Sequence, residues 1–212
     1  MRARILFALL DGREIPASEL AARANASAQS ASGHLRKLVA GGLIVTRAAG
    51  RQRLFHLASP QIAHAIEILG SIAPVAPIVS LRQHTTMQRL REARSCYDHF
   101  AGRLGVAITE SLTRNGAIEL CGDEFTLSTA GRRLLTRIGV DVDAAEIQRR
   151  SFARACIDWT ERRPHLAGSL GAALLSHAVA ECWVRRHPSE RSLQVTSEGK
   201  DALKTLFGIQ VA

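Results

Sequence analysis

Residues 16–57 read PASELAARANASAQSASGHLRKLVAGGLIVTRAAGRQRLFHL, and this stretch decides the fold of the N-terminal part of the chain. Its apolar residues recur at helical spacing over residues 17–24 and again over residues 28–40. The turn Asn25-Ala26-Ser27 lies between them, and Asn and Ser are common residues at the start of a helix. Gly41-Gly42 predicts the end of the second helix, because glycine readily takes the left-handed conformation that closes a helix.

Two short strands are predicted directly after the second helix, over residues 43–45 and 54–57. Two helices followed by a cationic hairpin are typical of a winged helix-turn-helix. In that fold one helix enters the major groove of DNA and the wing reaches the backbone or the minor groove. We therefore predict that DNA is contacted by polar residues of the second helix and the wing: Gln29, Ser30, Ser32, His34, Arg36, Lys37, Arg47, Arg51 and Arg53.

The positive charge of the chain is concentrated in the same region. The 212 residues carry a formal net charge of +9, and 46% of them are hydrophobic. Between Met1 and Pro60, nine basic residues are opposed by only three acidic ones, Asp11, Glu14 and Glu19. Such an excess attracts polyanions and suits phosphate contacts. We expect double-stranded DNA as the partner, and consider a merely solvated basic face the alternative.

The sequence predicts a cytoplasmic protein that is not associated with a membrane. No apolar run approaches the roughly 20 residues that span a bilayer. The start, Met1-Arg2-Ala3-Arg4-Ile5, lacks the apolar core of a secretory signal. In the cytoplasm the four cysteines are expected as thiols and not as structural disulfides.

The first third of the chain resembles the ArsR-type winged helix-turn-helix repressors. That family's pattern S-x-H-L-x-x-L-x-x-x-G-L, at the recognition helix and its exit, occurs here as Ser32, His34, Leu35, Leu38, Gly42 and Leu43. The segment Gly50-Arg51-Gln52-Arg53-Leu54-Phe55 is similar to the family's wing tip. The resemblance implies a homodimer that binds a palindromic operator and is released by an effector.

The chain departs from that family in two ways. The family's metal-sensing cysteines follow a Glu-Leu pair in the first helix of the motif, and Ala21 and Ala22 stand there in this chain. Arg51 and Arg53 stand where its second metal site has its earlier ligands, so neither family metal site is expected. The resemblance begins at the segment Arg4-Ile5-Leu6-Phe7-Ala8-Leu9-Leu10, and the family has a further helix before this segment, which we expect to be missing, shortened or outside this sequence.

The rest of the chain contains an internal duplication, in which residues 93–107 match residues 153–173 with six extra residues in the second copy. The match continues from residues 127–135 to residues 195–203. We predict the order helix, helix, hairpin, helix for each copy. The two cysteine motifs then lie on helices over residues 88–96 and 143–159.

The predicted fold is mainly α with small β-hairpins, an α+β protein. It combines an N-terminal winged helix-turn-helix with a C-terminal region of two degenerate winged-helix-like repeats. We expect a DNA-binding domain with its following helix over residues 1–70 and a linker with a connecting helix over residues 71–87. Residues 88–212 are expected to form a duplicated regulatory and dimerisation domain, with repeats at about 88–140 and 143–209.

Each copy of the duplicated segment contains a thiol, a carboxylate and an imidazole: Cys96, Asp98 and His99 in the first, and Cys156, Asp158 and His165 in the second. These groups ligate cations such as zinc, and thiols can also sense oxidants. In the structural alternative the aspartates cap helices and the cysteines pack in the core. The set contains no CxxC or HxxxH spacing. It is therefore a candidate metal or thiol-sensing site, with a transition metal such as zinc as the candidate cofactor.

Taken together, these features predict a sequence-specific DNA-binding transcriptional regulator. We expect a repressor of the ArsR type that leaves its operator when the C-terminal region senses an effector, which the sequence does not identify. The alternatives are an architectural DNA-binding protein and an enzyme that uses the Cys/Asp/His set. No nucleophile elbow, Walker loop, dinucleotide fingerprint or zinc-protease motif occurs, so we do not expect an enzyme.

Overall fold

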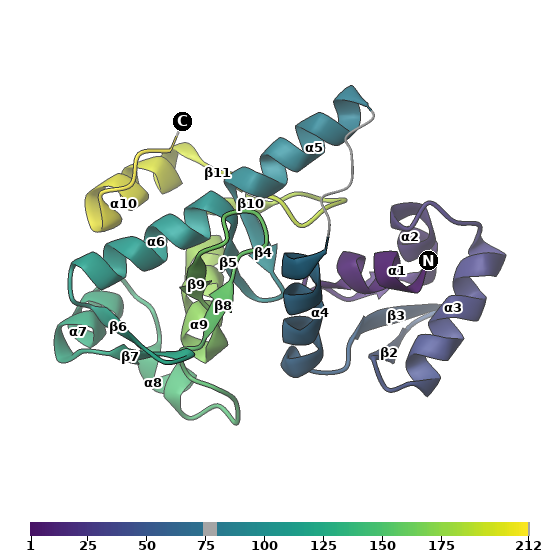
Figure 1. Cartoon of the computed structure of the whole chain (residues 1–212), viewed down its shortest axis with the longest axis horizontal. Coiled ribbons are helices and arrows are strands. Elements are labelled where there is room, and N and C mark those ends of the chain that lie inside the picture. The colour runs from purple at the N-terminus through teal and green to yellow at the C-terminus, as the bar shows by residue number, and fades with distance from the viewer. Residues whose placement is uncertain (74–79, 212) are drawn as a thin grey trace.

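A computed structural model of the protein describes residues 1–73 and 80–211, and Figure 1 shows the arrangement of its elements. The N-terminal region consists of α1 (Arg2–Leu9), β1 (Ile15–Pro16), α2 (Ala17–Arg23), α3 (Ala28–Ala40), β2 (Ile44–Ala49) and β3 (Gln52–Leu57). Its strands form one antiparallel sheet in the order β1-β3-β2. The predicted helix pair and the hairpin are therefore confirmed, whereas the short strand β1 was not predicted.

Local signals explain where α3 begins and ends. The Ser27 hydroxyl accepts a hydrogen bond from the Ser30 backbone N–H at 3.2 Å, which caps the first turn. Gly42 follows the helix with a φ of +67°, a conformation that a residue with a Cβ rarely adopts. Leu20, Leu35 and Ile44 are buried together, so α2, α3 and the first wing strand share one core.

Two helices lead from this region to the C-terminal part: α4 (Pro60–Ile72) and α5 (Leu81–Glu92). Residues 74–79, with both prolines of the predicted linker, lie outside the described residues. In Figure 1 α4 stands between the N-terminal region and the C-terminal part. None of the described helices is both long and apolar enough to cross a membrane.

The C-terminal part runs twice through the order hairpin, helix, hairpin, helix. The first half comprises β4 (Arg94–Cys96), β5 (His99–Ala101), α6 (Gly102–Arg114), β6 (Ile118–Cys121), β7 (Glu124–Leu127) and α7 (Thr129–Arg137). After the short helix α8 (Val142–Glu146), the second half comprises β8 (Ala155–Ile157), β9 (Pro164–Leu166), α9 (Gly168–Ala180), β10 (Val184–Arg186), β11 (Leu193–Val195) and α10 (Ser197–Phe207).

The predicted helices over residues 88–96 and 143–159 are wrong, because both cysteine motifs lie on strands. Helix α5 ends at Glu92 and α8 ends at Glu146, and the chain is extended before each cysteine. The strands that carry the two cysteines, β4 and β8, have only three residues each. Over so few residues, the alternating apolar pattern of a strand cannot be told from part of a helical pattern. The cross-strand hydrogen bonds that decide between strand and helix are not visible in the sequence.

The two halves interlock rather than standing apart. Helix α6 of the first half packs on β9 of the second, and α9 packs on β5 of the first. The Leu166 backbone N–H donates to the Thr109 hydroxyl at 2.8 Å, which joins β9 to α6 directly. Leu104, Leu170 and Leu203 belong to one hydrophobic core. The cysteine-bearing hairpins are thereby brought together at the centre of the C-terminal part.

Candidate functional site

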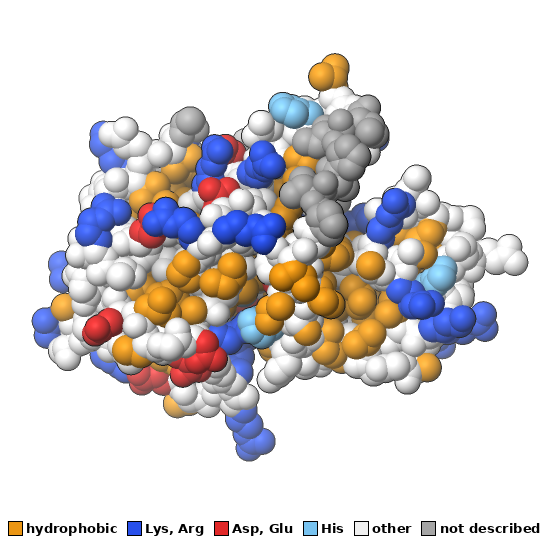
Figure 2. All heavy atoms as spheres, in the orientation of Figure 1, with side chains coloured by type: hydrophobic (Ala, Val, Ile, Leu, Met, Phe, Trp, Pro, Cys, Tyr) orange, Lys and Arg blue, Asp and Glu red, His pale blue; other side chains and the backbone are white. Residues whose placement is uncertain are grey.

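The predicted DNA contacts form an exposed surface on α3 and the wing. Eight of the nine side chains are exposed: Gln29, Ser30, Ser32, Arg36, Lys37, Arg47, Arg51 and Arg53. His34 is half-buried, and its Nδ1 is buried without a hydrogen-bond partner among the described residues. Figure 2 shows Lys and Arg side chains at the end of the molecule that α3 and β2 form in Figure 1.

The cations of this surface differ in how they are held. Arg51 and Arg53 make no ion pair within the described ranges, so their charges are available to an anion. Arg47 instead pairs with Glu14, and its Nε donates to the two carboxylate oxygens at 2.7 and 2.9 Å. This interaction lowers the pKa of Glu14 and raises the pKa of Arg47. A phosphate contact by Arg47 therefore competes with Glu14.

The second candidate site is a cluster of two cysteines and two histidines from the two C-terminal halves. Cys96 lies directly opposite His99 across β4 and β5, and Cys156 lies opposite His165 across β8 and β9. One ligand atom from each of the four residues lies within 4.8 Å of the others. The two sulfurs are 3.9 Å apart. We call these four residues the Cys/His cluster.

The cluster is enclosed by the protein. Its four side chains are between 0% and 3% exposed, and the two imidazole rings stack with their centroids 5.1 Å apart. His99 Nε2 and both ring nitrogens of His165 have no hydrogen-bond partner in the part of the chain that the structure describes. Buried polar atoms are nearly always satisfied, so three such nitrogens in one place require an explanation.

Asp98 lies beside the cluster and not in it. Its Oδ1 is 3.2 Å from His99 Nδ1, and its Oδ2 accepts a hydrogen bond from Arg150 at 2.6 Å. Burial alone would raise the pKa of Asp98, but His99 and Arg150 lower it below its ordinary value. The ionised carboxylate therefore occupies Nδ1 of His99 and leaves Nε2 of that ring toward the cluster.

Asp158 occupies a comparable place beside His165. Its Oδ2 accepts from Arg94 at 2.8 Å and from the Gly102 backbone N–H at 2.7 Å, and it lies 3.8 Å from His165 Nδ1. Burial opposes ionisation here too, but Arg94 and Thr160 hold the pKa of Asp158 well below its usual range. The structure thus divides the six predicted residues into four that converge and two carboxylates that lie beside the histidines.

Burial and neighbouring groups together shift the pKa values of Cys96 and His99. Burial, and then the neighbouring Cys156, raises the pKa of the Cys96 thiol well above its usual range. Burial disfavours a charged His99, but the Cys96 sulfur and the Asp98 carboxylate together raise the pKa of His99 to about 9. The Cys96 thiol is therefore a poor nucleophile, because the thiolate is the reactive form.

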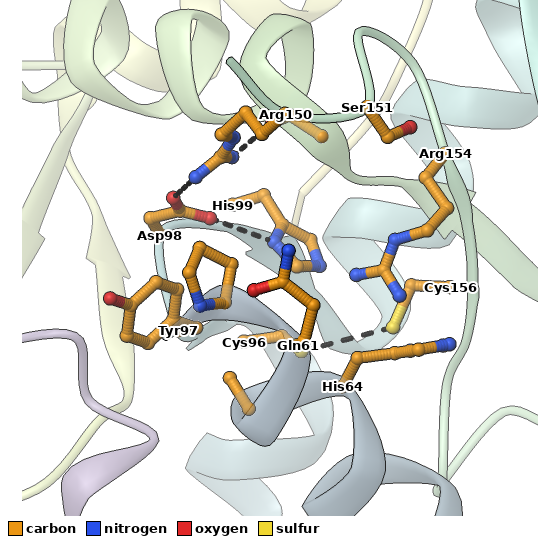
Figure 3. A pocket seen from close by; sticks show the side chains of 13 residues that line it. Gln61, His64, Cys96, Tyr97, Asp98, His99, Arg150, Ser151, Arg154 and Cys156 are labelled. Atoms are coloured by element: carbon orange, nitrogen blue, oxygen red, sulfur yellow. Dashed lines mark hydrogen bonds and ion pairs between the residues drawn. The ribbon is translucent and has the colours of Figure 1, made fainter. Parts of the chain in front are cut away.

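A cavity of about 180 Å³ lies between the cluster and α4. Its lining includes Cys96, His99 and Cys156 together with Gln61 and His64 of α4, and Figure 3 shows these side chains. Arg150 and Arg154 also line this cavity, which is thus basic apart from Asp98. The pKa of His64 is lowered by burial and by Arg154, so this imidazole is held neutral.

Sequence reasoning missed the contacts that join this site to the DNA-binding region. On α4, the buried Glu67 accepts a hydrogen bond from Arg191 at 2.7 Å. The Tyr97 backbone N–H, in the turn between β4 and β5, donates to the Leu10 carbonyl at 2.8 Å. The partners are 124 and 87 positions apart in the chain, so no local pattern reveals them. The matching arginines ahead of the two cysteines were a signal for the site itself, because Arg94 pairs with Asp158 and Arg154 lines the cavity.

The exposed helix α3, its capped start and the basic wing define a winged helix-turn-helix DNA-binding protein. Residues 1–53 match the MarR family, which is a winged helix-turn-helix family related to the ArsR type. The chain is 39% identical over 210 residues to YdfF of Bacillus subtilis (strain 168), an uncharacterized HTH-type transcriptional regulator, and the match covers 99% of this chain and 93% of that protein. The chain belongs to the HTH-type transcriptional regulators.

Two solved structures are similar over the N-terminal region. Reduced HlyU from Vibrio cholerae N16961 is 32% identical, and the match covers 35% of this chain and 77% of that chain with a TM-score of 0.32. The cadmium metal-sensor CMTR from Mycobacterium tuberculosis is 36% identical, and the match covers 37% of this chain and 85% of that chain with a TM-score of 0.29.

Proposed function

We propose that this regulator is a sequence-specific repressor of the ArsR type. Helix α3 enters the major groove, where Gln29, Ser30, Ser32 and His34 meet base edges. Arg36 and Lys37 of α3 and Arg47, Arg51 and Arg53 of the wing hold the phosphate backbone. The observation that carries this proposal is the exposure of this surface, with Arg51 and Arg53 free of internal ion pairs.

The C-terminal part acts as the regulatory and dimerising region in this proposal. Residues 1–70 bind DNA, residues 71–87 connect, and residues 88–212 form two degenerate winged-helix repeats at about 88–140 and 143–209. The repeated element order hairpin, helix, hairpin, helix supports this division. The protein acts in the cytoplasm as a homodimer on a palindromic operator, and it works by binding rather than by catalysis.

The effector acts at the site formed by Cys96, Asp98, His99, Cys156, Asp158 and His165. The contacts of the cavity support this placement, because α4 follows the wing directly and forms one wall of the cavity beside the cluster. Helix α4 packs against β8, the strand that carries Cys156, and the Tyr97–Leu10 hydrogen bond joins the β4–β5 hairpin to the end of α1. Differential contacts of this kind are what a ligand needs in order to shift DNA affinity.

Selection from a random pool of double-stranded DNA with the full-length protein tests the proposal. We expect enrichment of a palindromic sequence, at which the protein binds as a dimer. Zinc, an oxidant and a metabolite mixture are then added separately to the complex, and we expect one of them to release the DNA. Binding with no sequence enrichment, or an operator complex that none of them changes, would contradict the proposed repressor.

A further inference from the structure

We propose that Cys96, His99, Cys156 and His165 bind a single divalent transition-metal ion of the zinc class in tetrahedral geometry. Asp98 and Asp158 do not ligate this ion but position the two histidines. The inference rests on the proposed function only for its regulatory meaning, because the site itself follows from the geometry of the Cys/His cluster.

The distances fit a tetrahedral ion better than they fit a disulfide. Zinc–sulfur bonds of about 2.3 Å at a tetrahedral angle place two sulfurs about 3.8 Å apart. The observed separation between Cys96 Sγ and Cys156 Sγ is 3.9 Å, almost twice the roughly 2.05 Å of a disulfide bond. All four donor atoms lie within 4.8 Å of one another, so one ion can reach them all.

The unpartnered nitrogens point to the same conclusion. The Nδ1–H group of His99 donates a hydrogen bond to the Asp98 carboxylate, so Nε2 of the ring remains free to ligate a metal. Asp158 lies on the Nδ1 side of His165 at 3.8 Å, which leaves Nε2 of that ring for the metal as well. Metal-bound histidines usually contact a carboxylate through their second nitrogen in this manner.

Charge balance favours a divalent ion. Two thiolates and two neutral imidazoles carry a charge of about −2, which a divalent cation cancels, and buried charges require such compensation. The two carboxylates are already balanced by other residues, since Arg150 pairs with Asp98 and Arg94 pairs with Asp158. A mixed sulfur and nitrogen donor set selects zinc-class ions over calcium or magnesium, which prefer oxygen.

The ion joins the two C-terminal halves. Each half supplies one cysteine and one histidine from opposite strands of its own hairpin, so neither half has more than two donors. Four protein donors also leave no open coordination position, as in structural and regulatory zinc sites and unlike catalytic ones. Loading or loss of the ion therefore changes how the β4–β5 and β8–β9 hairpins meet behind α4.

Metal analysis of the full-length protein tests the site. We expect about one zinc per chain after purification under reducing conditions and desalting, and less than a tenth of that in the double variant Cys96→Ser, Cys156→Ser. The matched control changes the exposed thiols instead, Cys121→Ser with Cys182→Ser, and should retain the zinc. Equal zinc in both double variants would overturn the proposal.

Cobalt is the second probe, and it needs no folded double variant. Added to the metal-free wild type, Co²⁺ should give the strong visible bands of a tetrahedral ion and a thiolate charge-transfer band. Cys96→Ser should reduce the charge-transfer band by about half, since one of two thiolates is lost. Weak octahedral bands, or a Cys96–Cys156 disulfide in freshly isolated metal-free protein, would overturn the site.

The aspartates are tested as positioning residues. Asp98→Asn should keep the tetrahedral cobalt spectrum but weaken zinc binding about 10–100-fold in chelator competition. An altered spectrum would make Asp98 a ligand and overturn its assigned role. DNA binding is measured on the same samples. Zinc without DNA binding would contradict the proposed function alone, and DNA binding by a protein that takes up no metal would contradict the metal site alone.

Discussion

The arginines of the N-terminal surface and those around the Cys/His cluster are held in opposite ways. Arg51 and Arg53 project from the wing into solvent without an internal carboxylate partner in the described structure. Arg94 is 0% exposed, pairs with Asp158 and lies with its guanidinium 4.8 Å from the centre of the Trp159 ring. Burial therefore separates two states of the same residue type: exposed arginines that are free for an anion, and a buried arginine that is held by a carboxylate.

The physical reason lies in solvation. An exposed guanidinium stays hydrated, contributes little to the stability of the fold and remains available to phosphate. A buried one has lost its water, so its partner carboxylate and hydrogen bonds must compensate for that loss. Changes at the N-terminal surface should therefore alter DNA binding and leave the stability of the fold nearly unchanged, whereas changes at the buried arginine near the cluster should lower that stability.

Arg94→Ala should cause the largest loss in the free energy of unfolding. It leaves the buried Asp158 without its cation, and breaking a buried pair from one side costs about 3–5 kcal/mol. Arg154→Ala is the matched control, because Arg154 holds the same place in the second half, is half-buried and makes no ion pair in the described ranges. We expect a change within about 0.5 kcal/mol for the control. Urea unfolding measures the stability of both variants. Equal losses of stability would contradict the conclusion that only the buried, paired arginine supports the fold.

Gly168→Ala should cause the second-largest loss in the free energy of unfolding. Gly168 has a φ of +79°, and an added Cβ would lie 2.6 Å from the Phe152 carbonyl oxygen. Strain and overlap together predict a loss of about 2–4 kcal/mol. Gly116→Ala carries the same strain at a φ of +65° but meets no atom within 4 Å, so a loss of about 1–2 kcal/mol is expected. Thermal unfolding that ranks the two in the reverse order would show that the start of α9 is not tightly packed.

On the exposed side of the comparison, Gln29→Ala should relax base preference at one position of each half-site, by about 1–3 kcal/mol. Its unfolding should match that of the wild type, because the side chain is exposed. Gln194→Ala on β11 is the control, since it removes an exposed glutamine from the C-terminal part. If selection with the Gln29 variant returns the wild-type operator at full stringency, α3 is not the reading helix.

The smallest effects are expected for the wing. Arg51→Ala and Arg53→Ala should each weaken binding to all DNA sequences alike and lower the salt dependence by about one unit per lost phosphate contact. Arg47→Ala should weaken DNA binding and lower its salt dependence less than the other two variants, because Arg47 is already paired with Glu14. Arg114→Ala, at the exposed end of α6, is the charge-matched control. Salt titrations in which all four variants behave alike would remove the wing from the interface.

The sequence predicted the location of the candidate sites better than their geometry. The surface residues of α3 and the wing were chosen by local pattern and eight of the nine are exposed, while their contact with DNA stays a prediction. The six cluster residues were chosen because they recur and four of them converge, but they were placed on helices and given one shared role. Arg150 was not recognised as the partner of Asp98, because it comes from the loop after α8 and not from the position that matches Arg94.

By itself, the sequence determined the helix-turn-helix and wing, because their signals are local: the Ser27 cap, the left-handed Gly42 and the apolar spacing of α3. It also determined which chemical groups the two C-terminal halves share. Only the tertiary structure decided that Cys96 faces His99, that Cys156 faces His165 and that both pairs meet at one centre. Strand pairing, the interlocking of α6 with β9 and the burial of Arg94 against Asp158 join residues far apart in the chain. Such contacts form only when the whole core is buried, so no single stretch of residues encodes them.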